Sequence, residues 1–332
     1  MKKWVLHLVG SPESQFFYEL SLIYARNAFQ MREFPPIYLV AFPDGEWALG
    51  DDLAGELDRK SLATVFAELQ GREISFAVPH LFCDSGLSTV RSLIENFLKI
   101  PLLGSSGRTG QISGSKLLTC TLAKAAGVRT AGTRVYAEQT QISSFPVIIK
   151  PDQADNSEGV SLVRKAEELG DALALAEQCG GFTLVEDFIP GRELRAAVIE
   201  RGGKLVLLPV IEYLVSGERP LRLPEDKLDF TSSGLPEGQV RQAKVRNCCP
   251  ADLSQDLEKQ LKEACVRMHR ILGCRHFSLF DFRVHEESGE LYFLEAGLFW
   301  SFTPQSMISK MIAAGGEDVR EVVTELWKEW TS

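Results

Sequence analysis

The sequence predicts a mixed α/β fold organised as two or three domains. Three observations support this: the chain has 332 residues, strands and helices alternate over the first third, and the order of elements changes after a segment rich in glycine and serine near residue 104. A chain of this length exceeds what one hydrophobic core usually serves, so division into domains is expected. Alternating strands and helices indicate a parallel sheet covered by helices.

The alternating pattern occupies residues 1–103. Short apolar runs predict strands, and stretches that are apolar on one face predict helices. Gly10-Ser11-Pro12 separates the first strand from the first helix, and Pro43-Asp44-Gly45 is the turn after the second strand. We expect strands at 4–9, 37–42 and 74–78 and helices at 14–29, 61–69 and 87–98.

Residues 104–188 predict a smaller α+β unit. Gly104–Gly114 indicates a linker because glycine and serine dominate it. A polar loop at 151–158 separates two neighbouring strands. We expect helices at 116–126 and 166–178 and strands at 147–150, 159–163 and 183–188.

Residues 189–332 predict a third unit, also α+β. A long polar stretch, Val215–Asn247, interrupts it. A helix is expected over about Leu253–Leu272, with Asp252 or Ser254 as its N-cap. We expect strands at 195–199, 205–211, 277–284 and 290–295, the last two joined as a hairpin.

Composition excludes several classes of function. The chain has 36 Lys plus Arg, 45 Asp plus Glu and a formal net charge of −9, which argues against general binding to nucleic acid or to anionic membranes. Seven cysteines without a CxxC pair and five histidines without metal-ligand spacing argue against a zinc site. The apolar run Val5–Val9 is too short to span a bilayer, and no signal-peptide cleavage pattern follows it. We therefore expect a cytoplasmic protein with free thiols.

Three charged residues stand in apolar strands. Lys150 ends the run 145–149, Asp281 lies between Phe280 and Phe282, and Glu295 ends the run 291–294. Because desolvating a charge is costly, each needs a partner, and a buried ion pair is the simplest one. Two carboxylates on adjacent hairpin strands, with lysines nearby, are also suited to holding Mg²⁺ against a polyphosphate.

These residues belong to a series of motifs that resembles the ATP-grasp superfamily, specifically its D-alanine–D-alanine ligase branch. The resemblance covers nearly the whole chain and is strongest from Gly104 onward, where the motifs keep the family's order. The motifs are Gly104-Ser105-Ser106, Ser115-Lys116, Ile149-Lys150-Pro151, Ser157-Glu158-Gly159, Val185-Glu186-Asp187-Phe188-Ile189-Pro190-Gly191-Arg192-Glu193, Cys249-Pro250-Ala251-Asp252-Leu253, Asp281-Phe282-Arg283 and Phe293-Leu294-Glu295-Ala296. The resemblance implies an ATP-grasp fold with an N-terminal parallel α/β domain (1–103), a small central α+β domain (104–188) and a C-terminal α+β domain (189–332).

The resemblance also implies a binding site for Mg-ATP between the last two domains. Lys116 and Lys150 would contact the phosphates, and Ser157 in the loop 152–158 would donate to the γ-phosphate. An ordinary surface hairpin is the alternative for that loop. Asp281 and Glu295 would hold Mg²⁺.

The remaining implied positions concern the nucleoside and the substrate. Glu186, Asp187 and Ile189 would belong to the hinge whose backbone binds adenine, and Glu193 would accept from the ribose. A solvated strand end is the alternative for Glu193. His80 has the family's position near the substrates, and a structural role is its alternative.

Several positions depart from the family's pattern. Gly297 replaces an asparagine that is a metal ligand, which puts a second Mg²⁺ in doubt. Leu279 replaces an arginine that stabilises the reaction intermediate, and Gln15 replaces a glutamate that binds the first D-alanine. Asp155 stands where the phosphate loop usually has glycine.

The motifs that would bind ATP are thus kept, whereas positions that would serve the D-alanine substrates are altered. This combination indicates a changed acceptor. The opening segment 4–14 resembles the ligase that joins serine, threonine or another amino acid to mycosporine-glycine in the biosynthesis of mycosporine-like amino acids. A D-alanine–D-alanine or other dipeptide ligase is the alternative enzyme, and a nucleotide-binding protein with impaired catalysis is the alternative from another class. By resemblance, the partners are small molecules and a second copy of the chain in a homodimer.

Overall fold

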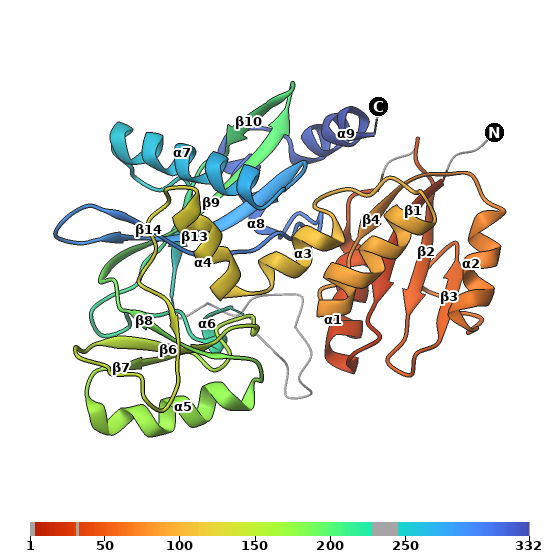
Figure 1. The fold of residues 1–332 in the computed structure, drawn as a ribbon. Helices are drawn as coiled ribbons and strands as arrows, with labels where there is room; N and C mark the ends of the chain where they lie inside the picture. Colours follow the sequence, from red (N-terminus) through yellow and green to blue (C-terminus); the bar gives the residue numbers. More distant parts are fainter. Residues whose placement is uncertain (1–3, 31–32, 228–244, 332) are drawn as a thin grey trace.

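The computed structural model describes residues 4–30, 33–227 and 245–331, arranged around three sheets (Figure 1). The polar stretch predicted at 215–247 lies partly outside these residues. None of the helices within the described ranges combines the length and the apolar character that crossing a membrane requires.

The first sheet has the strand order β3-β2-β1-β4. Its central strand β1 pairs in parallel with both β2 and β4, as the alternation predicted. The antiparallel edge strand β3 was not predicted. The predicted helix 87–98 forms as two π-helical turns, Gly86–Val90 and Leu93–Phe97. The other elements are β1 (Trp4–Gly10), α1 (Gln15–Asn27), β2 (Pro36–Ala41), β3 (Trp47–Gly50), α2 (Leu62–Gln70) and β4 (Ile74–Pro79).

The second sheet is antiparallel, with the order β5-β8-β6-β7, and α5 covers its outer face (Figure 1). The predicted linker 104–114 is wrong in part. It contains the helix α3, whose N-cap Ser106 accepts from the Thr109 N–H. The elements are α3 (Gly107–Ser113), α4 (Lys116–Ala125), β5 (Arg134–Val135), β6 (Val147–Pro151), β7 (Ser161–Val163), a 3₁₀ turn (Ala166–Glu168), α5 (Leu169–Gln178) and β8 (Thr183–Asp187).

The third sheet has the order β12-β11-β9-β13-β14, with β10 also paired to β9. The strand predicted at 205–211 is instead two strands, because Pro209 between them has no N–H to donate. Ser254, not Asp252, caps α7. The elements are β9 (Gly191–Arg201), β10 (Lys204–Leu207), β11 (Ile211–Tyr213), α6 (Pro224–Lys227), β12 (Asn247–Cys248), α7 (Gln255–Ile271), β13 (Phe277–His285), β14 (Leu291–Ala296), α8 (Met307–Ala314) and α9 (Val319–Trp330).

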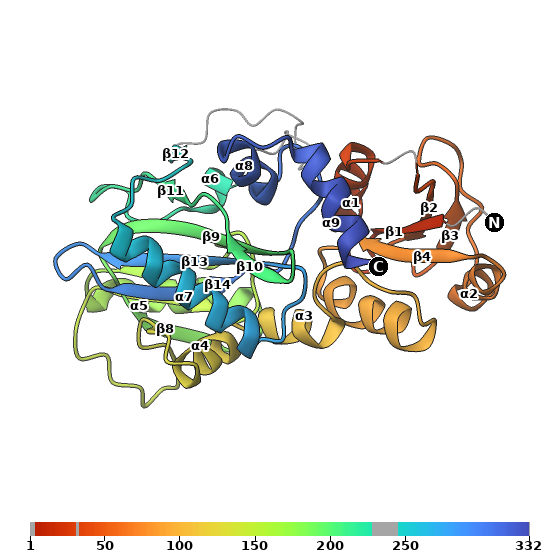
Figure 2. The ribbon, with the colours of Figure 1, turned by 90° about the horizontal axis from the view of Figure 1, so that it is seen from above.

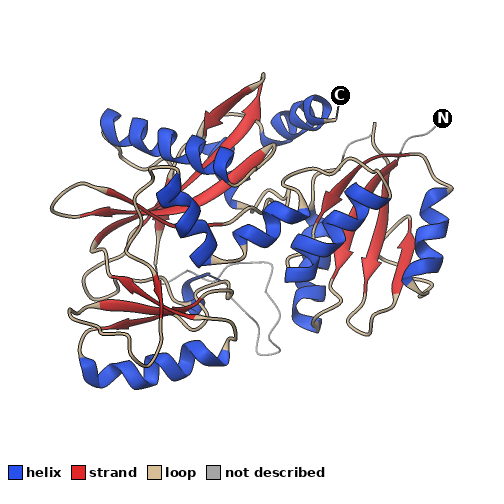
Figure 3. Cartoon of the chain, in the orientation of Figure 1, coloured by secondary structure: helices blue, strands red, loops and turns tan. Residues whose placement is uncertain are grey.

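One hydrophobic core joins the first sheet to the third. The helix α9, which the sequence did not predict, runs beside β4 (Figure 2). Its Trp327 meets Phe76 of β4 edge to face, with the ring centroids 5.5 Å apart. Figure 3 shows the second sheet set below the third, with β6 and β8 facing β13 and β14. In this arrangement β6, β13 and β14 all contribute residues to one cleft.

Candidate active site

A cleft lies between the second and third sheets. It encloses about 750 Å³, counting the part open to solvent, which is in the range of small-molecule sites. The lining comes mainly from β6, the loop after it, β8, β9, β13 and β14. The lining residues are Lys116, Ile148, Lys150, Pro151, Ala154, Ser157, Glu158, Val160, Glu186, Asp187, Phe188, Ile189, Glu193, Leu221, Arg222, Asp281, Arg283, Leu294 and Glu295.

Lys150 is held in the cleft by a buried ion pair. Its side chain is 8% exposed and pairs with Glu186 of β8, which is 3% exposed. Thr133 donates to the other Glu186 oxygen at 2.8 Å. Burial opposes the charge on the Lys150 ammonium, but the carboxylates of Glu186 and, to a smaller extent, Glu295 raise the pKa of Lys150 above its ordinary value. Lys150 is therefore a fixed positive charge at the floor of the cleft.

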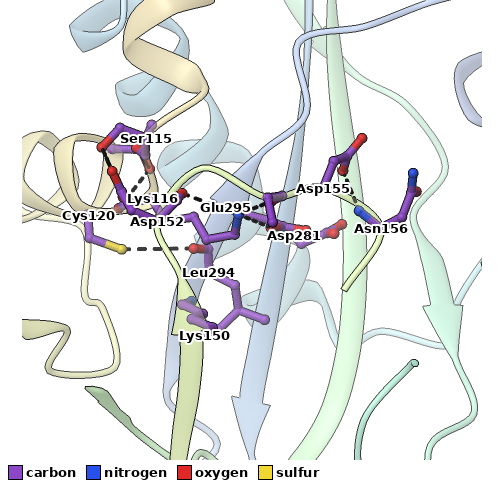
Figure 4. Close-up of polar contacts among 12 residues, drawn as sticks. Ser115, Lys116, Cys120, Lys150, Asp152, Asp155, Asn156, Asp281, Leu294 and Glu295 are labelled. Atoms are coloured by element: carbon purple, nitrogen blue, oxygen red, sulfur yellow. Dashed lines mark hydrogen bonds and ion pairs between the residues drawn. The ribbon is translucent and has the colours of Figure 1, made fainter. Parts of the chain in front are cut away.

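Lys116 is the second lysine and stands at the first turn of α4. Its Nζ donates to the carbonyl of Ala154 in the loop that follows β6, and lies 3.9 Å from Glu295 Oε2 (Figure 4). The carboxylate of Asp152 accepts from the Ser115 hydroxyl at 2.8 and 3.0 Å and from the Leu117 N–H at 2.8 Å. These contacts tie the loop to the start of α4, where the helix dipole favours negative charge.

The loop 152–158 lies over the cleft with an unusual backbone. Asn156 and Ser157 both have positive φ, 52° and 62°. Serine rarely adopts this conformation, which costs of the order of 1 kcal/mol, and such strain gathers at functional segments. Asp155, where the family usually has glycine, accepts from the Asn156 N–H at 2.7 Å. Ser157 and Ala154 line the cleft, so the loop is part of the site and not an ordinary surface hairpin.

The predicted hinge, residues 186–189, forms one wall of the cleft. Glu186 and Ile189 are buried, whereas Asp187 is exposed at the end of β8. The Ile189 carbonyl accepts from Arg283 at 3.0 Å.

Glu193 is buried and bound by two arginines, so it is not a solvated strand end. Arg283, its direct neighbour on β13, donates to one oxygen at 3.0 Å, and Arg222 donates to the other. The Arg222 guanidinium lies 3.6 Å from the centroid of the Tyr213 ring. The same Arg222 reaches Asp281 at 3.2 Å.

Asp281 and Glu295 face one another across the β13–β14 ladder, as the predicted hairpin requires. Arg195 of β9 lies opposite Asp281 on the other side and donates to both of its oxygens at 2.6 Å. Glu295 is 31% exposed and lies 3.9 Å from Lys116. In the described part of the chain no three His, Cys, Asp or Glu side chains gather as a metal site.

This donor set can be compared with the needs of Mg²⁺. The ion commonly uses one or two protein carboxylates together with phosphate oxygens. Glu295 fits that requirement because it is partly exposed in the cleft. Asp281 fits less well, since Arg195 engages both of its oxygens.

His80 does not reach the cleft. It is fully buried directly after β4, and its Nε2 lies 3.0 Å from Nδ1 of His7. Burial and the neighbouring His7 lower the pKa of His80 well below its ordinary value. His80 does not line this cleft, so its catalytic role stays a prediction and the structural role stays its alternative.

Three arginines were not predicted from the sequence: Arg222 and Arg283, which line the cleft, and Arg195, which binds the cleft residue Asp281. A signal for one of them was present, since Glu193 and Arg195 alternate with Leu194 and Ala196, the pattern of a strand with one polar face. The prediction began that strand at Arg195, four residues after its true start at Gly191. No local pattern indicates Arg222.

The cleft and its motifs can now be compared with known proteins. The D-ala D-ala ligase C-terminus family matches residues 120–328. This chain belongs to that family. Solved ligases share the whole fold: the chain superposes on the VanG D-Ala:D-Ser ligase from Enterococcus faecalis with a TM-score of 0.75 at 21% identity, covering 99% of this chain and 100% of that one. The D-alanine–D-alanine ligase from Coxiella burnetii gives a TM-score of 0.75 at 16% identity, covering 100% and 94%. The fold is therefore the predicted ATP-grasp fold.

Curated relatives agree with this assignment. The chain is 29% identical over 271 residues to the D-alanine–D-alanine ligase of Geobacter sulfurreducens, covering 79% of this chain and 75% of the relative. It is 24% identical over 312 residues to the vancomycin B-type resistance protein VanB of Enterococcus faecalis, covering 89% and 88%. As a member of this family, the chain is an ATP-dependent, ADP-forming ligase.

Proposed function

We propose that the chain phosphorylates an oxygen of an acid-like acceptor with ATP and then joins the acceptor to an amino acid, releasing ADP and phosphate. The observation that carries this proposal is the convergence in one cleft of two lysines, a buried carboxylate, a strained loop and a pair of facing carboxylates. Such a set suits phosphoryl transfer, which depends mainly on positioning and on stabilising negative charge.

Each side chain has a task in this proposal. Lys150 and Lys116 would bind phosphate oxygens as point charges, and Ser157 with nearby N–H groups would close over the γ-phosphate. The backbone of 186–189 would bind adenine, and Glu193 would accept from the ribose. Because Arg222 engages Glu193 in this structure, nucleotide binding would have to move that arginine or share the carboxylate with it.

Mg²⁺ is the cofactor that this chemistry calls for. Glu295 would hold it together with phosphate oxygens, beside Asp281. Bound in this way, the ion would neutralise charge on the polyphosphate. The lysines supply the rest of the positive charge.

Two acceptors are candidates. The comparisons support dipeptide ligation of the D-alanine–D-alanine type best, because the curated relatives carry that name. Two side chains favour mycosporine-glycine joined to serine or threonine. Gln15, which replaces the family's ammonium-binding glutamate, donates to Glu19 at 2.7 Å on an exposed face of α1. Leu279, which replaces the intermediate-stabilising arginine, is buried in an apolar core. A site that lacks such groups loses large factors in rate for the substrate that needs them.

A substrate screen distinguishes the two acceptors. The purified protein is incubated with Mg-ATP and either D-alanine alone or mycosporine-glycine plus L-serine or L-threonine. If Gln15 and Leu279 mark a changed acceptor, D-alanine yields little ADP, and the second mixture yields ADP together with a red-shifted ultraviolet absorber. Rapid D-alanyl-D-alanine synthesis would instead establish the dipeptide ligase.

A further inference from the structure

Arg195 binds the carboxylate of Asp281, which the sequence predicted to be a metal ligand. Its Nε and Nη2 atoms donate to the two oxygens of Asp281 at 2.6 Å each. The two residues are direct neighbours on β9 and β13, so their backbones hold the pair in register. Arg222 adds a third contact to the same carboxylate at 3.2 Å. Asp281 is therefore bound by two guanidinium groups.

This ion pair is difficult to replace with a metal ion. The side chains of Arg195 and Asp281 are 18% and 4% exposed. A guanidinium keeps its charge at all working pH values, so Arg195 cannot leave by losing a proton. Breaking a buried pair strands one charge and is strongly unfavourable. A divalent ion on Asp281 would also face the positive charge of Arg195 at close range.

A second feature removes another metal ligand from the same place. Gly297 follows β14, where the family has its asparagine ligand. A Cβ built on Gly297 would meet only Leu279 Cδ2, at an ordinary contact distance of 3.9 Å. Glycine thus offers no side-chain ligand there, although the backbone has room for a Cβ. Glu295 lines the cleft, is 31% exposed and lies 3.9 Å from Lys116.

We propose that Arg195, fixed by Asp281, takes the place of one of the two magnesium ions, so that the nucleotide binds with a single divalent ion held at Glu295. The guanidinium supplies a permanent positive charge where a second ion would otherwise lie. Gly297 then lacks the amide that would bind the second ion, and Arg195 supplies positive charge in its place. This inference rests on the proposed function, because it requires Mg-nucleotide in the cleft.

The test counts metal ions per nucleotide. Equilibrium dialysis with Mn²⁺ and the non-hydrolysable analogue AMP-PNP gives the ratio of bound Mn²⁺ to bound nucleotide, and electron paramagnetic resonance checks the Mn²⁺ count. The wild-type protein should bind one Mn²⁺ per nucleotide. The double variant Arg195→Met/Gly297→Asn, which removes the two-bond partner of Asp281 and restores the amide, should bind two.

Arg192→Met is the matched control. Arg192 lies on the same strand and forms an equivalent two-bond pair with Glu212, at 2.7 and 2.6 Å, without contacting Asp281. Its ratio should stay at one. A ratio of two in the wild-type protein would overturn the inference and leave the proposed function intact, and this result requires no variant to fold. A ratio of one in a folded double variant would also overturn it. Failure of the wild-type protein to retain nucleotide would refute the proposed function itself.

Discussion

Replacing Lys150 by methionine should remove activity and stability for separate reasons. The substitution keeps the length of the side chain and removes the charge that faces the phosphates. One well-placed electrostatic group contributes about 10²–10³ in rate, so turnover should fall by at least that factor. The variant also strands the Glu186 carboxylate, whose side chain is only 3% exposed. Leaving a buried charge unpaired costs about 3–5 kcal/mol, a large part of a typical folding free energy.

A double variant separates the two effects. Lys150→Met/Glu186→Gln removes both charges and keeps a group that can accept from Thr133, which donates to Glu186 at 2.8 Å. Most of the lost stability should return in urea unfolding, whereas ADP release should stay low. Two results would refute this reasoning: a folded single variant with more than half of the wild-type ADP production, or a double variant no more stable than the single one.

Two further predictions concern binding and pH. Glu193→Ala should raise the KM for ATP more than it lowers kcat, because a ribose contact is made in both the ground and transition states; an unchanged KM would contradict the ribose assignment. Burial lowers the pKa of His7 from 6.5 to about 4, so the unfolded chain binds a proton between these values that the folded chain does not. Stability should therefore fall as the pH drops below 6.5, by about 2 kcal/mol from His7 alone at pH 5. Urea midpoints at pH 7 and pH 5 measure this loss, which should be smaller for His7→Phe; an equal loss in both proteins would contradict the role of His7.

The sequence predicted those site residues that stand out within a short stretch of the chain. Lys150, Asp281 and Glu295 stand out because a charge ends or interrupts an apolar run, and the structure brings all three to one cleft. The pairing of Arg195 with Asp281 could not be read in this way, because 86 positions separate the two residues and only the strand register joins them. Hydrophobic periodicity predicts that a strand exists but does not predict its neighbour.

Other misses have similar physical causes. The helix α9 was not predicted, although its Trp327 lies in the core that joins the first sheet to the third. The contact between His80 and His7 was not predicted either, because it depends on tertiary structure.

We infer that the cleft couples ATP cleavage to the joining of an amino acid to an acceptor. The most direct test of this inference is a coupled assay of ADP release by the purified protein with Mg-ATP, comparing no substrate, D-alanine, and mycosporine-glycine with and without L-serine or L-threonine. We expect slow ADP release with ATP alone and rapid release only when an acceptor and an amino acid are both present. In a dipeptide ligase, D-alanine would serve as both. Tight nucleotide binding without amino-acid-dependent ADP release from any mixture would contradict the inference and indicate a nucleotide-binding protein that has lost catalysis.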